Sequence, residues 1–138
     1  MAALSLVTVA LGGASAPGNL EASVSGLRST KGQVLACLTR RADKLARCDR
    51  DPDARRMTIP ASAKALHFTG LPSGEYALAL IHDENANNKL DTFMGIPREG
   101  FGFSRNPAIG FGPPSFAAAQ FTVTAGSIDE GVRVRYLL

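Results

Sequence analysis

Residues 76–82, YALALIH, are the strongest strand signal in the chain, and an Asp/Asn-rich segment follows them directly. A short, nearly continuous apolar run of this kind is typical of a strand buried in a β-sheet core. Comparable short runs occupy residues 20–24, 33–39, 57–59, 65–68, 120–123 and 132–136. The 14 Gly and 8 Pro among 138 residues supply many turns between them. We therefore predict an all-β fold, a single small β-sandwich of about seven strands of the Greek-key type, over residues 17–138.

Local patterns extend this prediction. Residues 20–24 alternate between apolar and polar, and we expect them to form a hairpin with residues 33–39. The apolar run 33–39 indicates a central strand. Residues 42–47 are compatible with one helical turn. The sequence predicts one long loop over residues 83–115, and loops of this length inside a small domain are often functional.

The amino-terminal segment has the pattern of a signal peptide. Residues 1–16, MAALSLVTVALGGASA, are mostly apolar and end in a small-x-small motif. No basic residue precedes the apolar run, so a first β-strand or a short anchor is the alternative. The run is too short to span a membrane comfortably. We expect a secreted or periplasmic protein whose mature form has no transmembrane span.

Cys37 and Cys48 are the only cysteines, with ten residues between them. In an exported protein, an even and closely spaced pair predicts a disulfide, here closing the loop 37–48. A zinc site is the less favoured alternative, because His67 and His82 add no known ligand spacing.

Basic residues are concentrated in one part of the chain. Residues 28–64 hold ten Lys or Arg and four Asp, a local charge of +6, whereas the whole chain carries +3. This segment could bind anionic surfaces of the cell envelope, but a solvated loop of mixed charge is the simpler interpretation. Aromatic residues for base stacking are missing between these charges, so we expect no binding of nucleic acid.

The segment after residue 82 has the ligand pattern of a calcium loop. Oxygen donors recur at alternate positions, namely Asp83, Asn85, Asn87, Lys89 through its backbone carbonyl, and Asp91. Calcium takes 6–8 oxygen ligands, and such a ladder can wrap around it. Met94 stands where a helical calcium hand has glutamate, so Glu84 or Glu99 would have to complete the shell. The alternative is a network of Asx turns without metal.

Phe101, Phe103 and Arg105 form a second candidate site, a ligand face within the long loop. Phenylalanines in such a loop more often point inward as anchors. A third hypothesis is a hydrolase that uses His82, Asp83 and Glu99 as acids and bases. No Ser lies in a nucleophile elbow, which disfavours it. We expect a monomeric binding or structural module, with an unknown envelope or extracellular ligand.

Four motifs make the sequence recognisable: LACLT (35–39), GLPSGEYALALIHDENANNKLDT (70–92), GIPREGFGFSRN (95–106) and FGPPSF (111–116). Together they resemble a bacterial family of exported proteins catalogued as domain of unknown function 2141 (DUF2141). The resemblance runs from about Leu20 to Leu138. It implies a transthyretin-like (prealbumin-like) β-sandwich behind a signal peptide, with no established activity. The ladder is also similar to calcium loops of B-type repeats in bacterial surface adhesins.

Overall fold

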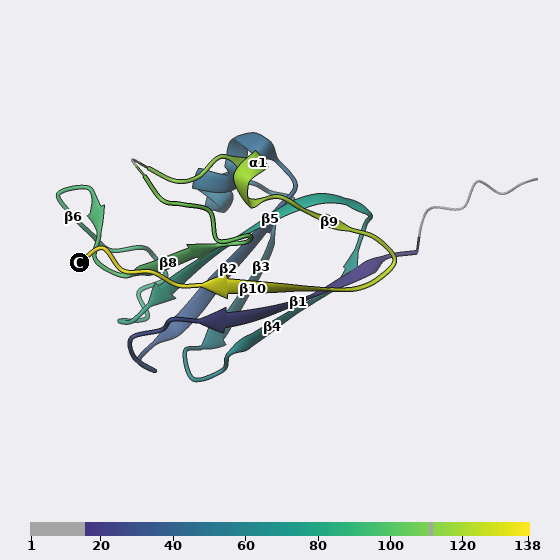
Figure 1. Ribbon diagram of the computed structural model, residues 1–138. Helices are drawn as coiled ribbons and strands as arrows, with labels where there is room; N and C mark the ends of the chain where they lie inside the picture. Colours follow the sequence, from purple (N-terminus) through teal and green to yellow (C-terminus); the bar gives the residue numbers. More distant parts are fainter. Residues whose placement is uncertain (1–15, 111) are drawn as a thin grey trace, which may run out of the picture.

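The computed structural model describes residues 16–110 and 112–138. Apart from Ala16, the predicted signal peptide lies outside the described residues. The fold is an all-β sandwich of two packed sheets, as predicted (Figure 1). The first sheet has the order β10–β1–β4, with β1 at Gly18–Ser25, β4 at Ala65–Leu71 and β10 at Gly126–Arg133.

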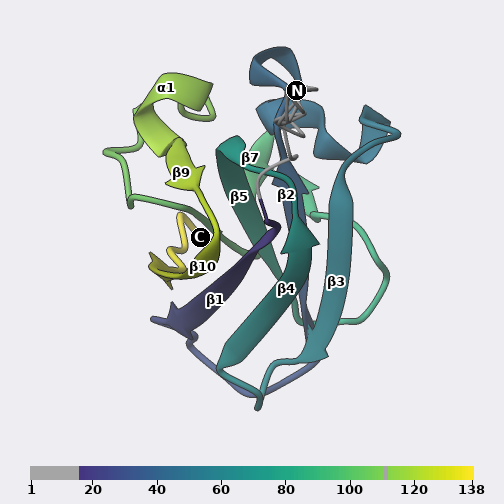
Figure 2. The same ribbon diagram turned by 90° about the vertical axis from the view of Figure 1, so that its right-hand side faces the viewer.

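The second sheet has the order β3–β2–β5–β8, and β9 also pairs with β5. Its strands are β2 (Gln33–Thr39), β3 (Arg55–Pro60), β5 (Gly74–Asp83), β8 (Gly100–Phe103) and β9 (Phe121–Val123). A small separate hairpin joins β6 (Thr92–Phe93) to β7 (Ile96–Pro97). The helical elements are the 3₁₀ helix η1 (Ala42–Arg50) and the short α1 (Phe116–Ala119). Figure 2 shows β1 and β4 of the first sheet in front of β2 and β5 of the second.

Alternation of side chains places the core between the sheets. Every second residue of β1 is buried, including Leu20, Ala22 and Val24, while the residues between them are exposed. Val34, Ala36 and Leu38 of β2 meet this face in the same apolar cluster. The central position predicted for residues 33–39 is confirmed, because β2 lies between β3 and β5.

The predicted hairpin of residues 20–24 with 33–39 is wrong. β1 pairs in parallel with β10 and antiparallel with β4, whereas β2 belongs to the other sheet. The connection between them crosses from one sheet to the other, with left-handed turns at Gly26 and Gly32 (φ 80° and 68°). Alternation determines which face of a strand is buried but not which strand lies beside it.

Residues 83–115 also contain more regular structure than their pattern indicated. β8 pairs with β5 as an additional strand. A Cβ at Gly100 would lie 2.5 Å from the Tyr136 ring, and one at Gly102 would lie 2.8 Å from the Arg133 carbonyl oxygen. Glycine is therefore required because the carboxyl-terminal segment passes directly over β8. The last strand differs as well, since β10 covers residues 126–133 where the sequence predicted 132–136.

One serine joins the two strands that share the outer edge of β5. β9 pairs with residues 74–76 of β5, and β8 pairs with residues 79–82. Between these stretches, Ser104 Oγ accepts from the Leu78 N–H at 2.9 Å, and the Ser104 N–H donates to the Leu78 carbonyl at 2.9 Å. Ser104 is fully buried, and its hydroxyl also donates to the Ala119 carbonyl at 2.6 Å. The edge of β5 is thus covered along its length.

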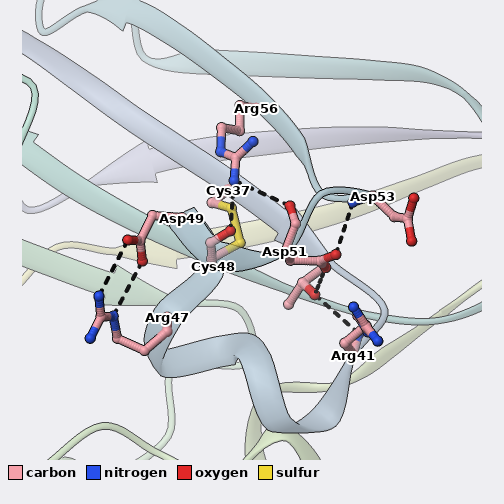
Figure 3. Close-up of a disulfide and its surroundings, with 9 residues drawn as sticks. Cys37, Arg41, Arg47, Cys48, Asp49, Asp51, Asp53 and Arg56 are labelled. Carbon is pink, nitrogen blue, oxygen red and sulfur yellow. Dashed lines mark hydrogen bonds and ion pairs between the residues drawn. A yellow bond between two sulfur atoms is a disulfide. The ribbon is translucent and has the colours of Figure 1, made fainter.

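The predicted disulfide between Cys37 and Cys48 is confirmed, and it ties η1 to β2 (Figure 3). The buried Asp51 carboxylate accepts from the Thr39 hydroxyl at 2.6 Å. Arg56 donates to the carbonyls of Cys48 and Asp51 at 2.8 and 3.2 Å. The disulfide loop is therefore packed against the sheet by polar contacts as well as by the covalent bond.

Within residues 16–110 and 112–138, no helix has the length and apolar character needed to cross a bilayer.

Replacing both cysteines tests the contribution of this loop to stability. For Cys37→Ala/Cys48→Ala we expect the free energy of unfolding to fall by about 2–4 kcal/mol, because the unfolded chain gains freedom. Chemical denaturation with and without dithiothreitol measures the difference. Reductant should lower the stability of the native protein and leave that of the double variant unchanged. Equal sensitivity of the two proteins to reductant would contradict the assignment.

Candidate functional site

The Asp/Asn-rich segment begins at the buried end of β5. His82 and Asp83 are both 0% exposed, and Asp83 lies opposite Gln33 of β2. A carboxylate at such depth requires several hydrogen-bond donors. The turn that follows supplies most of them.

Asp83 determines the shape of this turn through backbone N–H groups. Its Oδ1 accepts from Asn87 N at 3.1 Å, and its Oδ2 accepts from Asn88 N at 2.8 Å and from Gln33 Nε2 at 2.8 Å. Ala86 and Asn88 take left-handed φ values of 56° and 64°. Asparagine tolerates this conformation better than most residues, which explains why one stands at position 88.

Asp91 is the point on which the side chains of the segment converge. Asn85 Nδ2 donates to its Oδ2 at 2.7 Å, and Asn87 Nδ2 donates to its Oδ1 at 2.8 Å. Asn87 Oδ1 in turn accepts from Lys89 N at 3.2 Å. The hydrogen bond from Asn87, with a further one from Asn85, holds the pKa of Asp91 below its ordinary value. All five residues of the predicted ladder therefore belong to one hydrogen-bond network. Asp83 joins this network because its Oδ1 accepts from Asn87 N.

Glu99 joins the two ends of the segment. Its Oε2 accepts from Glu84 N at 2.6 Å, and its Oε1 accepts from Asp91 N at 3.0 Å. Glu99 is 5% exposed. Burial raises the pKa of this carboxyl group, and the neighbouring charge of Asp91 adds to the effect. The sequence identified Glu99 as a possible ligand, and in the structure it fixes the backbone of the loop.

Arg28 connects this loop to the end of the chain, a role that the sequence did not reveal. Its guanidinium donates to Glu84 Oε1 from Nε at 2.9 Å, to Leu138 O at 2.7 Å and to Arg98 O at 3.1 Å. It also lies over the Tyr136 ring, 4.4 Å from the ring centre. Burial alone would raise the pKa of Glu84, but the hydrogen bond and charge of Arg28 outweigh it and lower this pKa.

His82 is held in place through both ring nitrogens. Nε2 lies 2.8 Å from the Lys31 carbonyl oxygen, and Nδ1 lies 2.6 Å from the Tyr136 hydroxyl. A carbonyl oxygen only accepts, so Nε2 carries the proton, and in the neutral ring Nδ1 accepts from Tyr136. This arrangement is typical of a structural histidine.

The three residues of the second predicted site do not form one common face: Phe101, Phe103 and Arg105. Phe101 is 8% exposed, and half-buried Phe103 packs against a small apolar cluster that includes Leu45 and Ala119. The space beside the two rings measures about 10 Å³, room for about one water molecule. Arg105 is exposed and borders a different hollow. The two phenylalanines have the contacts expected of anchors.

The donor set of the Asp83–Asp91 segment is mixed. Within residues 16–110 and 112–138, no three His, Cys, Asp or Glu side chains are grouped as metal ligands. The converging groups are instead carboxylates, asparagine amides and backbone, the oxygen ligands that hard cations such as Ca²⁺ accept.

Comparison with known proteins identifies the family. Residues 22–130 match the family model described as uncharacterized protein conserved in bacteria (DUF2141). The chain belongs to this family. No curated protein and no solved structure matches it. The matched part of this DUF2141 chain includes strands of both sheets and the whole Asp83–Asp91 segment.

Gly32 provides a test of the packing beneath the segment. A Cβ at Gly32 (φ 68°) would lie 2.1 Å from the Asp83 carbonyl oxygen, whereas one at Gly70 (φ 66°) would meet nothing within 4 Å. We expect Gly32→Ala to lower the free energy of unfolding by about 2–4 kcal/mol and Gly70→Ala by about 1–2 kcal/mol. Both variants carry the same backbone strain, so their difference in denaturant melts measures the clash. Equal losses would contradict this close approach.

The ion pair of Arg28 and Glu84 predicts a pH dependence. The folded pKa of Glu84 is lowered from 4.5, so its contribution is complete above that pH and is lost as the pH falls through the lower folded value. The stability difference between the native protein and Arg28→Gln should therefore shrink below pH 4.5. The change should not exceed about 1 kcal/mol, because the side chains are 43% and 21% exposed. Denaturant melts across this pH range measure it, and a constant difference would exclude the coupling.

Proposed function

We propose that this protein is an exported, non-enzymatic β-sandwich module whose Asp83–Asp91 loop binds calcium. The bound cation would join the side chains of Asn85, Asn87 and Asp91 on a backbone that is already fixed. Assignment to the transthyretin-like class of sandwiches, and export behind a signal peptide, remain predictions that accompany this proposal. The disulfide supports export, since such bonds persist in oxidising compartments.

One observation carries the calcium proposal: two asparagine amides, Asn85 and Asn87, point at the same carboxylate, Asp91. A terminal amide that turns over exchanges its nitrogen for its oxygen. The same two side chains would then present oxygens to a cation lying next to Asp91, in exchange for the hydrogen bonds that they accept from Lys89 N and Asn87 N at 3.2 and 3.3 Å. Part of the shell would come from water, as in many calcium sites.

The fixed backbone of the turn supports the proposal as well. Asp83 and Glu99 accept the N–H groups of Asn87, Asn88, Glu84 and Asp91. These bonds set the positions of the ladder residues before any cation binds, which lowers the entropic cost of binding. With few carboxylates available as direct ligands, we expect a dissociation constant of about 10⁻⁴–10⁻³ M, the range of extracellular modules.

Neither alternative function has a specific observation in its favour. A hydrolase that uses His82 would need a ring nitrogen directed at a substrate, and both nitrogens are bonded inside the fold. A basic patch over residues 28–64 would need unpaired cations. Six of its ten basic side chains contact acidic groups or backbone carbonyls: Arg28, Arg40, Lys44, Arg47, Arg55 and Arg56.

Calorimetric titration of the purified protein with calcium tests the proposal. We expect saturable heat, and at about 10 mM calcium a stabilisation of about 1.4–2.7 kcal/mol in thermal melts relative to chelator. Asp91→Asn should lose both effects, because it removes the carboxylate on which the amides converge.

Asp49→Asn serves as the matched control, since it removes one exposed carboxylate in η1, outside the loop. It should bind calcium as the native protein does. The absence of both heat and stabilisation at this concentration would identify the ladder as an Asx-turn network without metal. An equal loss in both variants would instead indicate a general effect of charge.

A further inference from the structure

The sandwich has one flank that is only partly closed. β3 and β4 contact each other at the first flank. At the second, β10 forms the edge of its sheet, and β9 and β8 form the facing edge. Near β8 this flank is closed by a bridge between Phe101 and Arg135. Nearer β9, residues of β9 and of β10 line a hollow.

Asn106 forms hydrogen bonds with backbone groups in only the second half of the free edge of β10. Its Nδ2 donates to the Gly131 carbonyl at 2.9 Å, and its Oδ1 accepts from Arg133 N at 2.8 Å. One side-chain amide thereby makes the two bonds that the N–H and C=O of one residue in a neighbouring parallel strand would make. The odd-numbered residues of β10 therefore direct their backbone groups away from β1. Ser127 and Asp129 share this direction, and within residues 16–110 and 112–138 β10 pairs with no strand on that side.

The hollow beside these residues has the size of a ligand site. It measures about 510 Å³, within the range of roughly 300–1,000 Å³ that such sites occupy. It is open and mostly polar. Its charged and polar lining comes from β5, β9, β10 and the segments that follow β8 and α1: Glu75, Thr122, Glu130, Arg105 and Gln120. Ile128 of β10 adds apolar surface.

The charges around the hollow favour a cationic occupant. Among the residues that line it, Glu75 and Glu130 stand against one cation, Arg105, and Asp129 and Arg133 of β10 balance each other. Burial raises the pKa of Glu130, and Arg105 only partly offsets this effect. A carboxylate in this state is stabilised by a further positive charge.

We propose that this flank binds an extended, basic segment of a partner protein by strand addition. The segment pairs with the backbone of Ser127 and Asp129 and places a Lys or Arg side chain between Glu75 and Glu130. Main-chain bonds of this kind supply affinity, and alternate side chains supply specificity. The site is separate from the Asp83–Asp91 loop and does not depend on calcium.

A second copy of the chain is the less suitable occupant. Pairing of β10 with its own copy would bring Asp129 and Glu130 of the two chains together, and like charges at this distance oppose association. A basic strand instead meets the two carboxylates of Glu75 and Glu130, which outnumber Arg105 in the lining.

The test uses a defined probe, an acetylated and amidated hexapeptide of alternating Lys and Val, titrated against the purified protein. Two matched peptides accompany it: one with Glu in place of Lys, and one Lys peptide N-methylated at alternate residues so that it lacks donors along one edge. We expect saturable binding of the first and at least about tenfold weaker binding of the other two. Amide hydrogen exchange should slow at Ser127 and Asp129 in the complex.

Substitutions in the protein test whether the peptide binds at this flank. Glu130→Gln should weaken the Lys peptide about tenfold, whereas Glu21→Gln, which removes the same charge from the exposed face of β1, should not. Asp129→Pro removes one edge donor together with the carboxylate, and it should weaken binding severalfold more than Asp129→Asn, which removes the charge alone. If the proline variant does not fold, the N-methylated peptide tests the same bond on the unaltered protein.

Three results would overturn the proposal. The first is no binding of the Lys peptide. The second is equal binding of the N-methylated peptide, which would mean that charge alone attracts it. The third is a dimer in solution that protects Ser127 and Asp129 without peptide, which would assign the edge to self-association.

Discussion

The long strand β5 imposes the constraint on which the rest of the structure depends. It is largely buried, and a buried strand must have its backbone N–H and C=O groups bonded along both edges. β2 satisfies one edge from Ala77 to Asp83. The other edge is satisfied in pieces by β8, Ser104 and β9. The chain must therefore leave β5 at Asp83, return as β8, and return again as β9. The long segment between residues 83 and 121 is a consequence of this requirement.

The same rule explains why the loop after β5 is so polar and yet well defined. Asp83, His82 and Glu99 are buried, and each has hydrogen-bond partners from the loop or from a neighbouring segment. Throughout residues 16–110 and 112–138, no buried side-chain nitrogen or oxygen lacks a partner. Networks of this kind are cooperative, because the loss of one member leaves the others unsatisfied at low dielectric. The loop is consequently part of the folded core and depends on the contacts of Gln33 and Arg28 from elsewhere in the chain.

The features of this fold that could be predicted from the sequence are those that depend on residues close together in the chain. Strands with one buried face, such as β1 and β2, were located to within two residues, because their alternation is local. β8 was missed because its glycines are required by contact with Tyr136 and Arg133, some thirty residues away. The ladder residues were correctly grouped, since spacing within one turn determines their proximity. The contact of Arg28 with Tyr136 spans 108 positions and leaves no local pattern.

The segment that β5 requires also carries residues outside the two main sheets. Glu99 and β8 fix its middle, and residues 84–98 before them form only the separate β6–β7 hairpin. Asn106 illustrates how one side chain in this segment changes an exposed surface, since its amide completes half of the β10 edge and leaves the rest open. Arg105 and Asn106 both have left-handed φ values, 68° and 45°. Non-glycine residues adopt such values at a cost, and the surrounding structure must hold them there. The hydrogen bonds of Asn106 to Gly131 and Arg133 stabilise this turn. The same two bonds therefore explain both the left-handed conformation of the turn and the partial pairing of the β10 edge.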